Sequence, residues 1–224
     1  MSGFLNAVDG KAVPQSGPML YSAAEHAAIP GAWEPRFMPW LTATQALDSS
    51  GENRCGKYKS AYLRKPFTSA QIDAMWAYLG RKKYKKFSNK QALIQIDSYG
   101  SAINKPPGET AVPQRDSILK MQYQVYWNRR SDDDPGNVTE NLAWIRDTYR
   151  ATFANTGGVP VIGDVTDGCY INYPDVDLSD QKWNTSTDKW WRLYYKDAYP
   201  RLQRAKKRWD PCDIFRHQQS IKLP

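Results

Sequence analysis

The chain has 224 residues, of which 41% are hydrophobic and 24% are charged, and its formal net charge is +8. These proportions are typical of a globular protein and exclude a disordered one. Its three cysteines and two histidines are too few and too scattered for a disulfide framework or a zinc centre, so we predict no metal site.

The excess of positive charge attracts anions over long range, whether nucleic acid, phosphate or an acidic protein. Basic clusters at residues 81–86 and 204–208 follow or lie on predicted helices, where solvated side chains are the simpler interpretation. No zinc-finger, RNA-recognition or helix-turn-helix pattern occurs, so we predict no nucleic-acid partner. No apolar run approaches the roughly 20 residues of a membrane span. The N-terminus also lacks a secretory pattern, so we predict no membrane partner and leave the compartment open.

Residues 1–35 are rich in glycine, proline, serine and alanine and carry no pattern of a domain start. We predict an irregular connection there, with the ordered body beginning at residue 36. A loop is expected over residues 51–56. Residues 59–65 then predict a strand that ends before Pro66, because a proline restricts the residue that precedes it.

The first predicted helix begins with the spacing of a capping box, in which Thr68 and Gln71 satisfy each other's backbone N–H groups. Gly80 is placed to end this helix. Between these positions the apolar residues recur on one helix face: Ile72, Met75, Trp76 and Leu79. We expect this face to lie in the core.

Two further strands are predicted, and the second has an informative polar face. Residues 92–97 form the first, followed by Tyr99 and a proline-rich loop. Residues 117–127 alternate strictly between apolar and polar side chains, which indicates a long antiparallel strand with one buried face. On pattern alone, the polar face contacts solvent or forms the floor of a ligand site. Its members are Lys120, Gln122, Gln124 and Tyr126.

A second helix is predicted to start at Asn137, with Glu140 as its capping-box partner. Its core face would carry Leu142, Ile145, Tyr149 and Phe153. The C-terminal third is predicted to be helical, with Pro200 in the first turn of a helix that runs to residues 209–211. The apolar spacing there involves Leu202, Ala205 and Trp209.

Residues 169–173 mix aromatic, aliphatic and polar side chains and stop at Pro174, which predicts a short strand that ends in a turn. In a strand, Tyr170 and Asn172 would point to one side while Ile171 and Tyr173 point to the other. Hydrogen-bonding side chains would therefore gather where the strand ends. The alternative for the same residues is a buried core strand followed by a docking helix.

This stretch also begins an ordered set of matches. Residues 170–178 are Tyr-Ile-Asn-Tyr-Pro-Asp-Val-Asp-Leu, residues 190–195 are Trp-Trp-Arg-Leu-Tyr-Tyr, and residues 219–221 are Gln-Ser-Ile. The set resembles the C-terminal signature of the berberine-bridge-enzyme-like FAD-linked oxidoreductases. The resemblance extends over residues 37–221 and is to the C-terminal half of a family member.

The resemblance implies an α+β fold, in which an antiparallel sheet is backed by helices and followed by a helical C-terminal segment. The N-terminal FAD-binding domain of the family is expected to be absent. After the connection over residues 1–35, we therefore expect a substrate-binding-type α+β domain over residues 36–165. A berberine-bridge-like C-terminal segment would occupy residues 166–224.

The resemblance further implies oxidation of an alcohol, a sugar or an activated C–H group, with hydride transfer to FAD. Tyr173 matches the position of a catalytic tyrosine in relatives. A free phenol has a pKa of about 10, so a neighbouring cation or hydroxyl is needed for it to act as a base. Lys120 and Tyr99 are the candidates for these two neighbours. Gln122 would orient the substrate, because an amide does not titrate. The predicted catalytic residues are Tyr173, Tyr99 and Gln122.

The residues predicted to contact the cofactor are Asn172, Tyr170 and Asp175, and Asp175 is also expected to hold the turn. The resemblance implies FAD as the cofactor, although binding of FAD by this chain alone is doubtful. The predicted partners are a small-molecule substrate and either a separate FAD-binding domain or a second copy of the chain. The alternative function is a flavin-free binding or cyclising module derived from this family, since a cyclase needs only preorganisation and a proton donor.

Overall fold

The computed structural model describes residues 54–80, 91–105, 110–128 and 135–224, together with residues 85, 87 and 89. The connection predicted over residues 1–35 and most of the basic cluster at residues 81–86 lie outside the described residues. The described part belongs to one unit that begins at Arg54.

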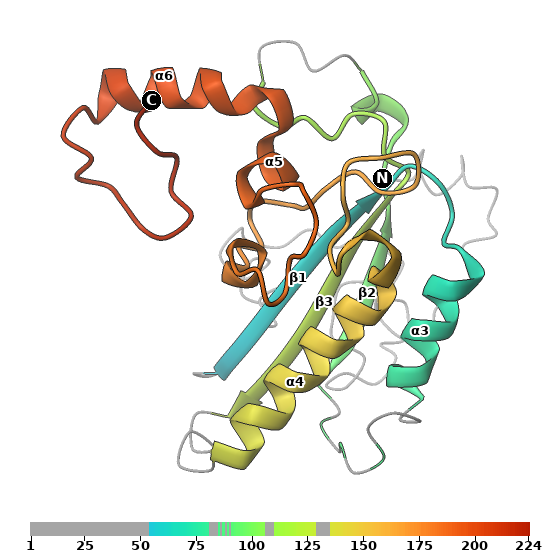
Figure 1. Ribbon diagram of the computed structural model, residues 1–224. Coiled ribbons are helices and arrows are strands. Elements are labelled where there is room, and N and C mark those ends of the chain that lie inside the picture. The colour runs from blue at the N-terminus through green and yellow to red at the C-terminus, as the bar shows by residue number, and fades with distance from the viewer. Residues whose placement is uncertain are drawn as a thin grey trace, which may run out of the picture. The chain divides into compact units, whose positions relative to one another are not determined.

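In the described part of the chain, three antiparallel strands form a sheet in the order β1-β3-β2 (Figure 1). They are β1 (Arg54–Leu63), β2 (Leu93–Ser98) and β3 (Leu119–Asn128). All three predicted strands of this sheet are confirmed. β1 begins earlier than expected, because its first residues, inside the predicted loop, pair in register with the end of β3.

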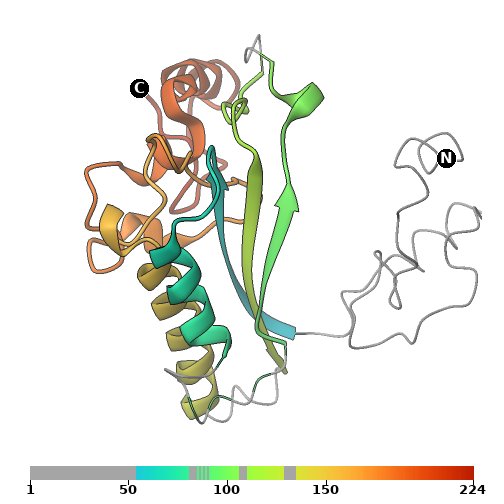
Figure 2. The same cartoon turned by 90° about the vertical axis from the view of Figure 1, so that its right-hand side faces the viewer.

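Helices α3 (Ser69–Leu79) and α4 (Pro135–Thr152) form a layer on one face of the sheet (Figures 1 and 2). Helices α5 (Trp190–Tyr195) and α6 (Tyr199–Trp209) lie in the C-terminal segment. The predicted α+β class, with an antiparallel sheet backed by helices and a helical C-terminal segment, is therefore confirmed. Because α4 begins at Pro135, Asn137 lies in its first turn and not at the predicted cap.

The core forms where the apolar face of β3 meets α4. Met121, Tyr123 and Val125 are fully buried, as their alternation predicted. The ring of Tyr123 packs edge-on against that of Tyr149, with centroids 5.1 Å apart, and Tyr149 packs against Phe153 at 4.9 Å. Such aromatic pairs stabilise a core beyond the apolar area that they bury.

Helix α3 has the predicted ends but not the predicted core face. Thr68 and Gln71 form the capping box, and Gly80 is the C-cap. Of the four apolar residues expected in the core, only Met75 is buried; the exposed ones are Ile72, Trp76 and Leu79. The prediction was wrong because α3 packs chiefly against α4, so most of its apolar stripe does not reach the core. Trp209 of α6 is likewise exposed.

The chain that follows α4 covers the C-terminal end of the outer edge of β1. The Tyr62 N–H donates to Gly168 O at 2.9 Å, the Asp167 N–H donates to Tyr62 O at 2.9 Å, and the Arg64 N–H donates to Val165 O at 2.8 Å. These hydrogen bonds pair backbone N–H and C=O groups at the strand edge that could otherwise pair with another strand.

Gly168, in this covering stretch, is expected to tolerate no side chain. Its φ is +79°, and a Cβ there would collide with the carbonyl oxygen of Leu193. Gly168→Ala should therefore lower the free energy of unfolding by about 1–3 kcal/mol, measured by urea denaturation. Gly163→Ala is the matched control: a Cβ there meets nothing within 4 Å, so its effect should stay within about 0.5 kcal/mol. Equal effects of the two substitutions would contradict the prediction.

Candidate active site

The segment that follows Gly168 passes around the edge of β1 and reaches both faces of the sheet. The strand β1 alternates, so Tyr58 and Tyr62 lie on one face and Lys57 and Lys59 on the other. Residues 170–173 meet the tyrosine face through ring contacts. Residues 175–177 meet the lysine face through ion pairs. One short segment therefore joins an open aromatic face to a buried charged one.

On the tyrosine face, six tyrosine rings follow one another with centroid distances of 5.0–6.1 Å. We call them the tyrosine row; in order they are Tyr126, Tyr58, Tyr173, Tyr170, Tyr62 and Tyr99. Each ring combines an apolar face with a hydroxyl, which suits a flat or hydroxyl-bearing ligand. Burial, with smaller contributions from Tyr99 and Tyr170, raises the pKa of Tyr62 far above its ordinary value. Tyr62 therefore stays protonated and is no candidate base.

Tyr173 is held both through its ring and through its backbone. Its ring stacks on that of Tyr58, with centroids 5.9 Å apart and planes 22° apart. The Tyr194 hydroxyl accepts from the Asp175 N–H at 2.9 Å and donates to Tyr173 O at 3.4 Å. Sequence reasoning did not single out Tyr58 or Tyr194. The alternation of β1 would have placed Tyr58 on the same face of the strand as Tyr62.

The other two predicted catalytic residues lie on the same face but do not surround Tyr173. The Tyr99 ring packs against Tyr62, with centroids 5.0 Å apart, and its hydroxyl donates to Gln114 O at 3.1 Å. Gln122 is buried on β3, opposite Ser60 of β1.

Lys120, the cation proposed for Tyr173, instead contacts other groups. Its Nζ lies 5.5 Å from the centroid of the Tyr170 ring and 3.1 Å from Asp97 Oδ2. Lys120 therefore contacts Tyr170, a neighbour of Tyr173 in the row, whereas Tyr99 contacts Tyr62, one ring further along.

The residues predicted to contact the cofactor separate into a hydrogen-bonded pair, Asn172 and Tyr170, and a buried residue, Asp175. Asn172 Nδ2 donates to the Tyr170 hydroxyl at 2.8 Å, and Asn172 is exposed. Asp175 is buried, and its carboxylate accepts from Lys57 Nζ at 2.8 Å and Lys59 Nζ at 2.6 Å. Its carboxylate therefore holds the turn, as expected.

The strand predicted over residues 169–173 is absent from the structure. The Tyr173 N–H donates to Tyr170 O at 3.1 Å and closes a turn, and the Tyr170 N–H donates to Ser60 Oγ at 2.9 Å, which anchors this turn to β1. The turn brings the Tyr170 and Tyr173 rings together, with centroids 5.2 Å apart. The prediction that these two side chains point to opposite sides was therefore wrong.

On the opposite face, five charged side chains form a buried charge cluster: Lys57, Lys59, Arg146, Asp175 and Asp177. Lys59 Nζ lies 2.6 Å from Asp175 and 2.8 Å from Asp177. Arg146 donates to both carboxylate oxygens of Asp177, at 2.8 and 3.0 Å. The cluster joins β1, α4 and the segment that carries Tyr173.

The stability of the fold depends on the negative charge of Asp177 and is therefore sensitive to acid. Burial alone would raise the pKa of Asp177, but the hydrogen bonds from Arg146 and the charges of Lys59 and Lys57 hold it well below its ordinary value of 3.8. Because the pKa is lower in the folded state than in the unfolded state, Asp177 stabilises the fold above pH 3.8. That stabilisation is lost as the pH falls below this value.

The variant Arg146→Met should therefore unfold at a higher pH than the wild type, because it removes the largest influence that lowers the pKa of Asp177. The midpoint of acid unfolding, followed by circular dichroism, measures this shift. Arg204→Met, which removes an exposed arginine of α6, is the control and should leave the midpoint in place. An unchanged midpoint in Arg146→Met would contradict the assignment.

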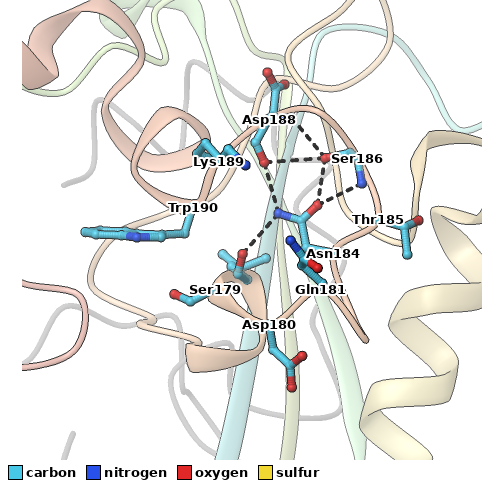
Figure 3. Close-up of a pocket in the computed structure, with 10 residues that line it drawn as sticks. Ser179, Asp180, Gln181, Asn184, Thr185, Ser186, Asp188, Lys189 and Trp190 are labelled. Atoms are coloured by element: carbon cyan, nitrogen blue, oxygen red, sulfur yellow. Dashed lines mark hydrogen bonds between the residues drawn. The ribbon is translucent and has the colours of Figure 1, made fainter.

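A separate polar pocket of about 390 Å³ lies between the 3₁₀ turn Val176–Ser179 and the start of α5 (Figure 3). Asn184 forms part of its wall and donates to Leu178 O at 3.0 Å and Asp188 O at 2.9 Å. None of the predicted site residues lines this pocket, so it is distinct from the tyrosine row.

The described ranges contain no group of three or more histidine, cysteine, aspartate or glutamate side chains suited to a metal ion. In the same ranges, no helix combines the length and the apolar character needed to cross a membrane.

Known proteins are similar to this chain in sequence. Residues 169–222 match the family model "Berberine and berberine like". The chain is 48% identical, over 189 residues, to the aclacinomycin-N/aclacinomycin-A oxidase of Streptomyces galilaeus, covering 83% of this chain and 33% of that protein. It is 40% identical, over 193 residues, to the hexose oxidase of Chondrus crispus, covering 82% and 34%. The chain thus spans about a third of the length of the curated relatives that it matches.

Solved structures also resemble this chain over part of their own length. The flavoenzyme CrmK of caerulomycin biosynthesis superposes with a TM-score of 0.71 at 41% identity, over 84% of this chain and 37% of that one. Aclacinomycin oxidoreductase superposes with a TM-score of 0.68 at 45% identity, over 83% of this chain and 36% of that one.

Proposed function

Over the part that it matches, this chain belongs to the berberine-bridge-like FAD-linked oxidoreductases, and on that premise we propose that it forms the substrate side of a FAD-dependent oxidase. The proposed reaction oxidises an alcohol, a sugar or an activated C–H group of a small molecule. When bound, FAD supplies the acceptor for the hydride. The residues of this chain would orient the substrate and take its proton.

The observation that carries this proposal is the way Tyr173 is held within the tyrosine row. A base contributes to catalysis only when it is positioned against the proton that it takes. The stack on Tyr58 fixes the ring of Tyr173, and the Tyr194 hydroxyl fixes its backbone. We assign the role of base to Tyr173 and substrate orientation to Gln122. Tyr99, whose ring is separated from that of Tyr173 by the rings of Tyr62 and Tyr170, is assigned to the far end of the row.

The pair of Asn172, which is exposed, and Tyr170, which is half-buried, fits the edge of a flavin ring. Because Asn172 Nδ2 donates to the Tyr170 hydroxyl, the Asn172 carbonyl oxygen remains an acceptor and the Tyr170 hydroxyl hydrogen remains a donor. A flavin ring edge carries both N–H and C=O groups, which such a pair can match. Asp175 would support this contact indirectly, because its carboxylate holds the turn. The remaining contacts with FAD we assign to a separate FAD-binding domain.

Titration with FAD, followed by visible absorption and flavin fluorescence, tests this assignment. The purified chain is titrated alone and with the co-expressed FAD-binding domain of the Streptomyces galilaeus oxidase. We expect retained FAD in the second preparation, and weaker retention in Asn172→Ala than in the control Asn155→Ala, which alters another exposed asparagine. A colourless protein in both preparations would contradict the proposal.

That outcome would favour the second candidate function, a flavin-free binding or cyclising module. The observation in favour of this candidate is the tyrosine row itself, whose rings and hydroxyls could bind a ligand or donate a proton without a cofactor. The tyrosine row would then serve as a binding surface and a source of proton donors. Redox-neutral turnover without FAD would distinguish this activity.

A further inference from the structure

Gln114 is a buried glutamine in the loop that precedes β3, with 2% of the residue exposed. Its Nε2 donates to Tyr194 O at 3.2 Å and to Cys169 O at 3.4 Å. Both partners are carbonyl oxygens, which only accept, so the NH2 group of the amide faces them. One side chain therefore links the end of α5 to the start of the segment that carries Tyr173.

The neighbouring Pro113 is held to the same two parts of the chain. Pro113 O accepts from Lys196 Nζ at 3.1 Å, and this ammonium lies 2.5 Å from Asp167 Oδ1. Lys196 follows α5 directly, and Asp167 is fully buried in the stretch that covers β1. Lys196 has a φ of +46°, in the left-handed region that lysine rarely adopts, so the contacts that hold it there must outweigh the strain. The loop is therefore fixed to both parts by an ion pair as well as by the Gln114 amide.

Tyr194 connects Gln114 to Tyr173. Burial raises the pKa of Tyr194 far above its ordinary value, so its hydroxyl keeps its proton. That hydroxyl donates to Tyr173 O at 3.4 Å and accepts from the Asp175 N–H at 2.9 Å. The backbone of Tyr194 is thus bound to Gln114, while its side chain is bound on both sides of Pro174. A movement of the end of α5 would therefore displace the turn that carries Tyr173.

We propose that Gln114 is a positioning residue for Tyr173 and acts through Tyr194. The same residue also holds the far end of the tyrosine row, because the Tyr99 hydroxyl donates to Gln114 O at 3.1 Å. Gln114 transfers no proton itself, since an amide does not titrate and both of its N–H groups are bound. A misplacement of about 1 Å can lower a rate by about 10²-fold. The effect on rate rests on the proposed function; the effect on the position of Tyr173 does not.

The first measurement needs neither FAD nor substrate. The full chain is labelled with fluorotyrosine, and the fluorine NMR signal of Tyr173 is identified as the one that Tyr173→Phe lacks. Gln114→Met removes both N–H donors and keeps a side chain of similar length. We expect the Tyr173 signal to shift by more than its linewidth, because the ring is then held less closely against Tyr58.

A double-mutant cycle tests the route through Tyr194. Tyr194→Phe keeps the ring but removes the hydroxyl that binds the turn. Gln114→Met should therefore shift the Tyr173 signal much less in the Tyr194→Phe background than in the wild type. If Gln114→Met does not fold, Gln114→Asn takes its place, because it withdraws the amide by one methylene and keeps a polar side chain.

The second measurement supplies the FAD-binding domain of the Streptomyces galilaeus oxidase and uses glucose as the sugar probe. Gln114→Met should slow the limiting rate of flavin reduction by about tenfold or more. The dissociation constant of glucose should change by less than about twofold, because Gln114 positions the base and does not bind the substrate. Anaerobic stopped-flow at several glucose concentrations separates the two quantities. A wild type that leaves the flavin oxidised would count against the redox proposal alone, because the fluorine signal reports the position of Tyr173 without it.

The matched control is Gln71→Met. Gln71 is another buried glutamine whose side chain is hydrogen-bonded, but its partner is Thr68 of the capping box. This variant should lower stability without moving the Tyr173 signal. The proposal is overturned if Gln114→Met leaves that signal in place, or if Gln71→Met moves it as much. It is also overturned if the shift is equal in both backgrounds of the cycle, or if the loss of rate lies in the binding of glucose.

Discussion

Asp177→Asn is expected to lower the free energy of unfolding by about 3–5 kcal/mol. The substitution keeps the shape of the side chain but removes its charge. Arg146 and Lys59, which both contact Asp177 within 3.0 Å, then lose a buried counter-charge. Urea denaturation followed by circular dichroism measures the loss, which should appear as a lower midpoint with an unchanged slope.

Asp197→Asn is the matched control. Asp197 also pairs with an arginine, Arg192, at 3.7 Å, but its side chain is 99% exposed. Water already solvates such a pair, so the substitution should change stability by less than about 1 kcal/mol. A similarly small loss in Asp177→Asn would show that the buried charge cluster contributes little to stability.

Tyr173→Phe is expected to slow the substrate-driven reduction of flavin by about 10²–10⁴-fold, the usual contribution of a positioned acid or base. The phenyl ring retains the stack on Tyr58, so the loss would report the hydroxyl alone. Anaerobic stopped-flow bleaching of the flavin, with the FAD-binding domain supplied, measures the rate. Binding of FAD should be unchanged.

Tyr58→Phe is the control for this effect, because it also removes one hydroxyl from the tyrosine row and keeps the ring. Its reduction rate should lie within a few fold of the wild type. If Tyr173→Phe is as fast as Tyr58→Phe, Tyr173 is not the base.

The elements predicted correctly from the sequence are those whose pattern is local. The alternation of β3 and the capping box of α3 depend on neighbouring residues, and both are confirmed. The turn at Tyr170 depends on Ser60, which is 110 positions earlier in the chain. The exposure of Trp76 depends on what packs beside α3. Neither can be deduced from local spacing.

The buried charge cluster was missed, although the sequence contained a signal for it. Lys57 and Lys59 are two residues apart on a strand and therefore share a face. Asp175 and Asp177 are also two residues apart. Two lysines on the buried face of a strand require buried counter-charges, and this pair of aspartates has the matching spacing. The catalytic residues rested on resemblance, and their roles remain predictions.

The passage of one segment around the edge of β1 also has a consequence for the order of folding. The bonds that anchor it join residues 118 and 116 positions apart, Lys57 to Asp175 and Lys59 to Asp175. Contacts between such distant residues close large loops and form slowly. Tyr173 can reach Tyr58 only after this closure. The tyrosine row is therefore a late product of folding, and intermediates that have already assembled the core against α4 are expected to lack it.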